Sequence, residues 1–266
     1  MLKTRLIPVL YLMNGVIVRS ETFSDFKIIG SPYDQLARLN EWLADELVYI
    51  DITREGDYDM DRRDKKYEVT NDIVAILKAI SKHAFMPLTF GGRVTSLADV
   101  DRFIANGADK VVINSAVHRR PELITEVAEK YGSQAMMVGI DVKREPGGGL
   151  ALHIDQGRTR CDGDPVAWAR EAERRGAGEI LVNSIDRDGT AEGYDVDAVR
   201  AIAGAVGIPV IACGGAGAFS DFCEAVSDGN ASAVAAGNIF HFTEHSYKRA
   251  KTTMREKGFN VRYPWA

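Results

Sequence analysis

The sequence contains few cysteines and no spacing typical of metal ligands. Its three cysteines, Cys161, Cys213 and Cys223, form no CxxC or Cys/His pattern, and an odd number cannot all pair within one chain. Four histidines, His83, His118, His153 and His245, likewise show no spacing typical of metal ligands. We therefore expect reduced thiols in a cytoplasmic protein that uses no metal and no other cofactor.

The chain also has little excess charge and no long apolar run. It carries 33 Lys and Arg against 38 Asp and Glu, a formal net charge of −5, so it lacks the basic surface that nucleic-acid binding requires. No apolar run approaches the ~20 residues of a membrane span. The opening "MLKTRLIPVLYLMNG" lacks the small-residue cleavage site of a signal peptide. We expect a soluble, non-exported protein with no nucleic-acid partner and no membrane span.

Eight short apolar runs, each bounded by turn residues, predict buried strands. They are residues 5–12, 46–52, 86–90, 110–114, 135–141, 179–185, 208–213 and 231–236. Amphipathic segments of helical period separate them, including residues 71–83, 96–107, 121–132, 164–176 and 195–207. This alternation predicts an α/β fold, a (β/α)8 TIM barrel occupying the 266 residues 1–266 as one domain. A doubly wound open sheet is the alternative, but it normally needs fewer strands.

The two halves of the chain resemble each other. Residues 90–114 match 213–237, and residues 45–56 match 178–189. The barrel is therefore expected to consist of two similar half-barrels with paired sites. Two segments depart from the repeat as insertions on the side where barrels place active-site loops: residues 54–68, and residues 144–163, whose Gly run suggests a hairpin.

Paired glycines follow one predicted strand in each half. Such glycines, placed between a strand and a helix, let backbone N–H groups hold a phosphate, although they can also serve only as tight turns. The next strand end supplies a second part of each site. The first phosphate set is Gly91, Gly92, Asn114 and Ser115, and the second phosphate set is Gly214, Gly215, Gly237 and Asn238. Their duplication favours an elongated ligand with a phosphate at each end.

Carboxylates and an amide end several of the predicted strands, where barrel enzymes carry catalytic groups. The candidates at the barrel mouth are Asp51, Asp141, Asn183 and Asp188. For Asp186 and Asp195 we favour helix capping or loop hydrogen bonding. Asp141 is the strongest catalytic candidate.

With these residues placed, the whole chain resembles the cyclase subunit of imidazole glycerol phosphate synthase. It is similar, more distantly, to the histidine-pathway phosphoribosyl isomerase that shares the duplicated barrel. The stretches that carry the resemblance are "DELVYIDIT", "GADKVVINSA", "GSQAMMVGIDVKR", "RGAGEILVNSIDRDGTAEGYD", "IPVIACGGAG" and "NIFHF". The resemblance implies a lyase-type cyclase subunit of a glutamine amidotransferase. Its C-terminal face would bind a bis-phosphorylated ligand, and a glutaminase subunit docked on the N-terminal face would send ammonia through the barrel.

One of the family's two catalytic aspartates falls on Asp141, and the other falls on Tyr11. Tyrosine has an ordinary pKa near 10, so it can donate a proton but cannot act as a base at neutral pH. Other mouth positions depart from the family as well: Arg19 replaces a Lys, Arg93 a third Gly, and Cys213 a small polar residue. Cyclase activity of the usual kind is therefore doubtful, and a different substrate is expected.

Four charged residues at predicted strand starts match the family's ammonia gate. They are Arg5, Glu46, Lys110 and Glu179. Each alone would be read as a solvated charge, but four opposite charges around the axis would have to pair with each other. We expect a salt-bridged gate that opens to a small neutral molecule.

An intact gate below a changed mouth suggests a paralogue of the cyclase. Mainly through the stretch "RLIPVLYL", the chain is similar to the barrel proteins that serve acetamidino modification of surface polysaccharide sugars. These are thought to work with a glutaminase and a third, amide-forming enzyme. Two alternatives remain open. One is a working imidazole glycerol phosphate synthase in which Tyr11, Asp51 or Asp188 supplies the missing group, and the other is a scaffold that only activates a glutaminase.

Overall fold

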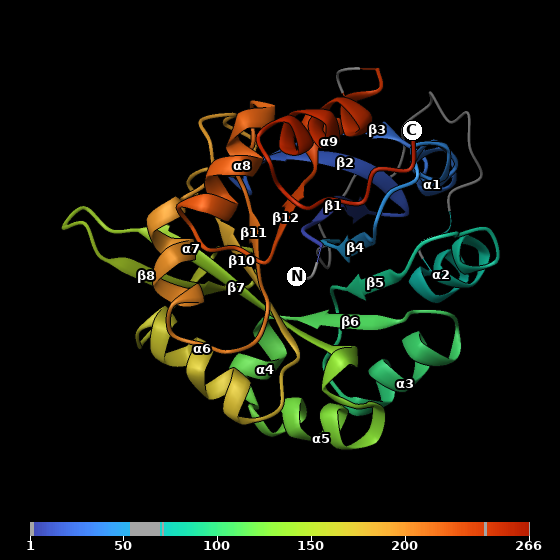
Figure 1. Cartoon of the computed structure of the whole chain (residues 1–266). Coiled ribbons are helices and arrows are strands. Elements are labelled where there is room, and N and C mark those ends of the chain that lie inside the picture. Colours follow the sequence, from blue (N-terminus) through green and yellow to red (C-terminus); the bar gives the residue numbers. More distant parts are fainter. Residues whose placement is uncertain (1–2, 54–69, 71, 242–243, 266) are drawn as a thin grey trace.

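Eight parallel strands close into a barrel in the computed structural model, which describes residues 3–53, 70, 72–241 and 244–265 (Figure 1). In order around the barrel they are β1 (Arg5–Met13), β4 (Leu47–Asp51), β5 (Leu88–Gly91), β6 (Lys110–Ile113), β7 (Met136–Arg144), β10 (Glu179–Ser184), β11 (Val210–Cys213) and β12 (Ala233–Ala236). Pairing of β12 with β1 and of β7 with β10 closes the ring. The predicted (β/α)8 fold is confirmed, whereas the assignment of residues 1–266 to one domain stays a prediction.

Helices cover the outside of the barrel (Figure 1). They are α1 (Pro32–Glu41), α2 (Ile73–Ser81), α3 (Leu97–Ala105), α4 (Ser115–Arg119), α5 (Glu122–Tyr131), α6 (Pro165–Arg174), α7 (Val196–Ala203), α8 (Phe219–Ser227) and α9 (Ser246–Glu256). Several begin at a side chain that accepts a hydrogen bond from a first-turn N–H, as Ser96 and Asp195 do, which satisfies a donor left open by the helix. Within the described ranges, no helix is both long enough and apolar enough to cross a membrane.

Strand residues alternate between two apolar cores. On β1, Leu6 and Leu10 pack outward against the helices, while Ile7, Val9 and Tyr11 point into the barrel. The inner core is filled by residues that share the barrel axis: Ile7, Val9, Val48, Val112, Met137, Leu181, Ile211, Ala233 and Ala235. This alternation explains why each strand reads as a continuous apolar run in the sequence.

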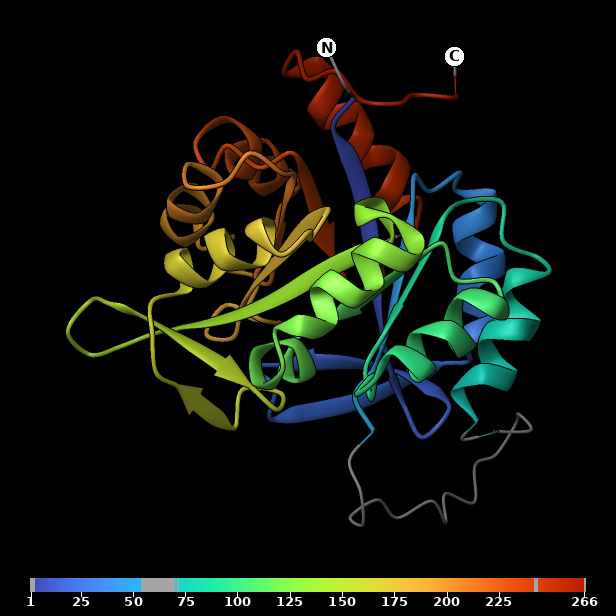
Figure 2. The same cartoon turned by 90° about the horizontal axis from the view of Figure 1, so that it is seen from below.

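Each half-barrel also carries an antiparallel meander at its mouth. β1 and β7 are both nine residues long. β1 turns back into β2 (Val16–Glu21) and β3 (Asp25–Gly30), and β7 into β8 (Leu150–Ile154) and β9 (Thr159–Cys161). Figure 2 shows both meanders at the end of the barrel away from the N-terminus. The hairpin predicted in residues 144–163 is confirmed, the first meander was not predicted, and the insertion at residues 54–68 lies outside the described residues.

Candidate functional site

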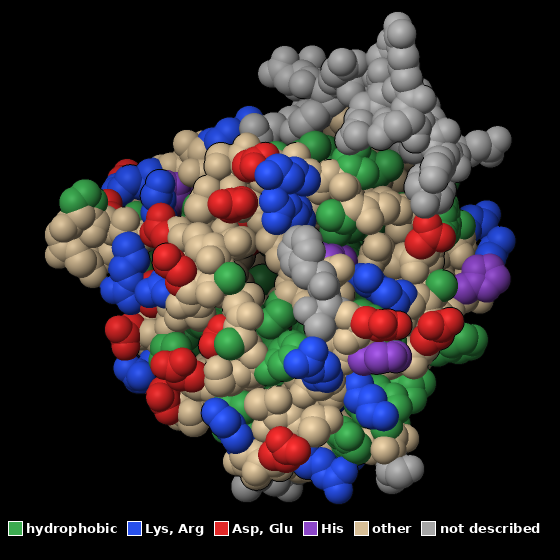
Figure 3. Space-filling view, turned by 90° about the horizontal axis from the view of Figure 1, so that it is seen from above, with side chains coloured by type: hydrophobic (Ala, Val, Ile, Leu, Met, Phe, Trp, Pro, Cys, Tyr) green, Lys and Arg blue, Asp and Glu red, His purple; other side chains and the backbone are tan. Residues whose placement is uncertain are grey.

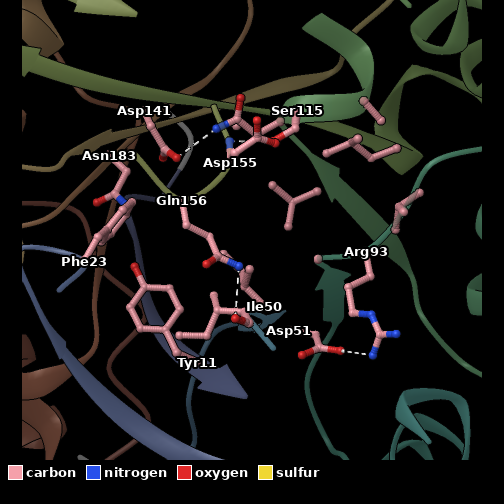
Figure 4. A pocket seen from close by; sticks show the side chains of 18 of the residues that line it. Tyr11, Phe23, Ile50, Asp51, Arg93, Ser115, Asp141, Asp155, Gln156 and Asn183 are labelled. Carbon is pink, nitrogen blue, oxygen red and sulfur yellow. Dashed lines mark hydrogen bonds and ion pairs between the residues drawn. The ribbon is translucent and has the colours of Figure 1, made fainter. Parts of the chain in front are cut away.

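A cavity of about 290 Å³ opens at the carboxyl ends of the barrel strands (Figure 4). Its walls come from β1, β4, β6, β7 and β10, from the β5–α3 loop, and from both meanders. This is the side where barrels of this kind place their chemistry, because loops there vary without disturbing the packed strands. Asp141, Tyr11 and Asn183 all line it, at the ends of three different strands.

Asp141 is the strongest acid–base candidate in this cavity. Its carboxylate accepts a hydrogen bond from Asn114 Nδ2 at 2.8 Å. Burial raises the pKa of Asp141 to about 7, although hydrogen bonds from Asn183 and Asn114 oppose the rise. A carboxyl group whose pKa lies near neutrality can either accept or donate a proton at neutral pH.

Tyr11 occupies the equivalent position in the other half. Burial, assisted by the negative charges of Asp188 and Asp141, raises the pKa of Tyr11 well above its ordinary value. The phenol therefore stays protonated at neutral pH and can only donate. Its ring meets the edge of Phe23, with ring centroids 6.4 Å apart, and Figure 4 shows both rings on one side of the cavity.

The first phosphate set reaches the cavity. Gly92, Asn114 and Ser115 line it, while Gly91 packs behind against β6. Gly92 has φ +85°, and a Cβ there would lie 1.9 Å from the Asp51 carbonyl oxygen. Packing alone therefore demands glycine at residue 92, whether or not a phosphate binds.

The second phosphate set does not line this cavity. Gly214 and Gly215 have positive φ angles, and a Cβ on Gly215 would lie 2.2 Å from the Gly193 carbonyl oxygen. Asn238 Nδ2 donates to the Ser20 carbonyl oxygen at 2.8 Å. Gly237 precedes Asn238 at the end of β12. The chain's own backbone thus approaches Gly215 and Asn238 closely.

The remaining mouth candidates separate into two groups. Asp51 lines the cavity, and burial raises the pKa of its carboxyl group. The carboxylate accepts a hydrogen bond from Thr53 N and lies 3.7 Å from an Arg93 guanidinium nitrogen. Asp188 lies outside the cavity, and its carboxylate accepts the Ser20 hydroxyl at 2.5 Å. Arg19 sits on β2 and does not line the cavity either.

Both aspartates expected to have loop or capping roles have them. Asp186 accepts the Arg144 backbone N–H at 2.6 Å. Asp195 caps α7 by accepting from Ala198 N and also receives the Arg144 side chain. Neither lines the cavity.

Sequence reasoning missed several residues that line the cavity. Two are arginines, Arg119 and Arg158; a third, Arg93, had been noted only as a departure from the family. Others come from the turns of the meanders: Phe23, Asp155 and Gln156. Gln156 spans the mouth by donating to the Ile52 carbonyl oxygen at 3.0 Å (Figure 4). Phe23 adopts a positive φ angle in a turn without a glycine, whereas Asp155 and Gln156 directly precede Gly157 in theirs.

The four gate candidates form a closed ring at the opposite end of the barrel. Arg5 lies 2.7 Å from Glu46 and 2.8 Å from Glu179. Lys110 lies 3.3 Å from Glu46 and 2.9 Å from Glu179. Each cation therefore contacts both carboxylates, and each carboxylate contacts both cations. The carboxylate side chains are only 10% and 11% exposed, so the ring is largely removed from solvent.

One protein-family model matches nearly the whole chain. A family model described as "Histidine biosynthesis protein" matches residues 5–246. That range contains every barrel strand, both meanders and all residues that line the cavity. Enzymes of histidine biosynthesis with this barrel define the family. The chain therefore belongs to the histidine biosynthesis protein family of barrel enzymes.

Proposed function

We propose that this chain is the ammonia-channelling barrel subunit of a glutamine amidotransferase system that serves acetamidino modification of a surface polysaccharide sugar. A glutaminase would dock on the N-terminal face, and ammonia would travel along the barrel axis to the cavity at the mouth. A third, amide-forming enzyme would complete the assembly. The ion-pair ring of Arg5, Glu46, Lys110 and Glu179 is the observation that carries this proposal.

The ring supports the proposal because its burial is costly. Taking four charged side chains out of water carries a desolvation cost, and well-packed apolar residues in such places are often at least as stable. A barrel that needed only stability would favour an apolar plug. A closed ring of opposite charges instead excludes water and ions, while the separation of one pair would admit a neutral molecule the size of ammonia.

The barrel interior above the ring also suits ammonia. Ile7, Val48, Met137 and Ala235 belong to the apolar inner core of the barrel. A neutral molecule loses little on entering such a region, whereas an ammonium ion would pay a large desolvation cost. At the far end Asp141, with its pKa near 7, can exchange a proton with what arrives.

A glutaminase assay tests this proposal. A glutaminase subunit of an amidotransferase system would be mixed with the chain, and glutamine hydrolysis would be compared with that of the glutaminase alone. We expect stimulation in the mixture. Lys110→Met should keep complex formation but release the labelled amide nitrogen of glutamine into bulk solvent. The matched variant Lys130→Met, in an exposed ion pair on α5, should behave as the wild type. Absence of both binding and stimulation would defeat the proposal.

A working imidazole glycerol phosphate synthase is the second candidate. It is favoured by Asp51, a carboxylate with a raised pKa that lines the same cavity as Asp141. Turnover of the histidine-pathway nucleotide with ammonium salts, or complementation of a histidine auxotroph, would support it. Asp51→Asn should then abolish that activity, whereas the first proposal expects no such turnover from the wild type.

A further inference from the structure

Three residues of the ion-pair ring begin a barrel strand, and the fourth does not. Arg5, Lys110 and Glu179 are the first residues of β1, β6 and β10, whereas Glu46 precedes the first residue of β4. Backbone pairing with a neighbouring strand holds each of the first three in place. The position of Glu46 in the ring therefore depends on the contacts of the segment that precedes β4.

Asp45 joins that segment to the start of β1. The backbone ladder between β1 and β4 begins further along both strands than the ring. Nearer the ring, the Asp45 carboxylate accepts the Leu6 N–H at 2.9 Å. Leu6 and Asp45 directly adjoin Arg5 and Glu46, which pair at 2.7 Å. The distance between these two ring members therefore depends on how Asp45 is held.

Two side chains of α9, Tyr247 and Lys251, hold this junction. The Tyr247 hydroxyl donates to the Leu6 carbonyl oxygen and accepts the Asp45 N–H, both at 2.8 Å. Lys251 Nζ donates to the Asp45 carboxylate and, at 2.9 Å, to the Arg262 carbonyl oxygen. Figure 2 shows α9, in red, beside the start of β1, in blue. One phenol therefore bridges β1 and the segment before β4 next to the ring.

Burial distinguishes these two side chains from others on α9. Lys248 and Arg249 are exposed on the side of the molecule seen in Figure 3, whereas Tyr247 and Lys251 are fully buried. A buried ion pair adds little stability over well-packed apolar residues, but it can fix one arrangement of the segments that it joins. The buried pair of Lys251 and Asp45 therefore suits a positioning role.

We propose that Tyr247 and Lys251 are positioning residues for the ion-pair ring. Both act through Asp45, which holds the neighbouring Glu46 beside Arg5. Loss of either contact would let Glu46 move away from the cations of the ring. This inference rests on the proposed function only for the role of the ring as an ammonia gate.

Proton exchange at the Lys110 ammonium group measures how tightly the ring is closed. The group would be observed by NMR in protein with isotope-labelled lysine nitrogen, and its signal would be assigned by its absence from Lys110→Met. Tyr247→Phe removes only the hydroxyl. We expect it to accelerate exchange of the Lys110 protons with water by about fivefold or more, the factor that corresponds to one lost hydrogen bond. Lys251→Met is the second variant and should accelerate this exchange as well, because Asp45 loses its cation.

Tyr194→Phe is the matched control. Tyr194 is also buried and donates its hydroxyl to a strand carbonyl oxygen at 2.9 Å, but this acceptor, Ala235, belongs to β12. The control should lower the stability to a similar extent and leave the exchange at Lys110 unchanged. Unchanged exchange in Tyr247→Phe would overturn the inference. Equal acceleration in Tyr194→Phe would overturn it too, because a general loss of stability would then explain the effect.

A second experiment separates this inference from the proposed function. In the complex with a glutaminase, Tyr247→Phe should release more of the labelled amide nitrogen of glutamine into bulk solvent than Tyr194→Phe does. Faster exchange at Lys110 without such release would uphold the positioning role and count against the ring as an ammonia gate. The NMR measurement needs neither glutaminase nor ammonia, so its failure is distinct from failure of the proposed function.

Discussion

Replacing Lys110 by methionine probes whether the ion-pair ring is one coupled unit. Lys110 contacts Glu46 at 3.3 Å and Glu179 at 2.9 Å, and its side chain is 16% exposed. Methionine keeps the length of the side chain but removes its charge, so both carboxylates retain only Arg5. Loss of one partner from a fully buried pair costs about 3–5 kcal/mol. Because the ring keeps some contact with water, we expect a loss of about 2–3 kcal/mol in the free energy of unfolding.

Urea unfolding followed by circular dichroism measures this loss. The double variant Lys110→Met/Glu46→Gln removes one charge of each sign and should recover part of the stability, with a coupling energy of about 1–3 kcal/mol. Lys130→Met is the control, because Lys130 forms an exposed pair with Asp101 and should lose less than about 1 kcal/mol. If Lys110→Met costs no more than this control, or the cycle shows no coupling, the four charges are independently solvated and our reasoning about the ring is wrong.

Three other perturbations have expected outcomes. Asp141→Asn should stabilise the protein at alkaline pH, by at most about 4 kcal/mol, because a folded pKa raised to about 7 means that the ionised carboxylate opposes folding. That gain should shrink as pH falls from about 8 to about 5. Urea unfolding of both proteins across this range measures it, and a stability difference that does not change with pH would contradict the prediction. Gly92→Ala should lower the free energy of unfolding by about 3 kcal/mol or more, since its Cβ meets the Asp51 backbone, whereas Gly147→Ala, in open space, should change it by less than about 1 kcal/mol in the same urea assay. Lys251→Met should cost about 3–5 kcal/mol in thermal unfolding, because Lys251 is fully buried and its loss leaves the buried Asp45 carboxylate without its cation; a melting temperature equal to that of the wild type would contradict this.

The barrel was predictable because its strands and helices follow simple periods. Each strand is buried on both faces, so it reads as an apolar run, and the helices repeat every three to four residues. The second meander was also predictable, since a Gly run marks its turn. The first meander was missed, although Asn14 and Gly15 form its first turn with the positive φ angles typical of a two-residue hairpin. Only its second turn, where Thr22 and Phe23 adopt positive φ angles, lacks a glycine or an Asn to signal it.

The site was predictable where it depends on strand ends and unpredictable where it depends on loops. Asp51 ends β4, and Asp141 lies near the end of the part of β7 that pairs in parallel with β10, so the apolar runs before them placed both at the mouth from the sequence alone. Arg119 and Arg158 come from α4 and from a turn, and nothing in their local sequence directs them to one cavity. The contact of Ser20 with Asp188 joins the first meander to the loop after β10 across 168 residues. No local pattern encodes such a contact.

Tyr11 and Asp141 occupy equivalent positions in the two half-barrels but differ in chemistry. Tyr11 lies close enough to Asp141 and Asp188 for their charges to raise its pKa. A second carboxyl group at this position would therefore repel the first, and two nearby carboxyl groups cannot both ionise easily. We predict that Tyr11→Asp raises the apparent pKa of Asp141 further above 7, as followed by carboxyl carbon NMR.

Tyr11→Phe is the matched variant for this titration. It removes the hydroxyl without adding a charge, and Tyr11 is not among the groups that set the pKa of Asp141. The Asp141 titration should therefore remain near 7 in Tyr11→Phe. If the pKa of Asp141 also stays near 7 in Tyr11→Asp, the two mouth positions are not electrostatically coupled. The tyrosine at residue 11 would then not be the reason that Asp141 exchanges protons at neutral pH. A rise confined to Tyr11→Asp would instead show that replacing one carboxylate of a pair by tyrosine sets the remaining one to exchange protons at neutral pH.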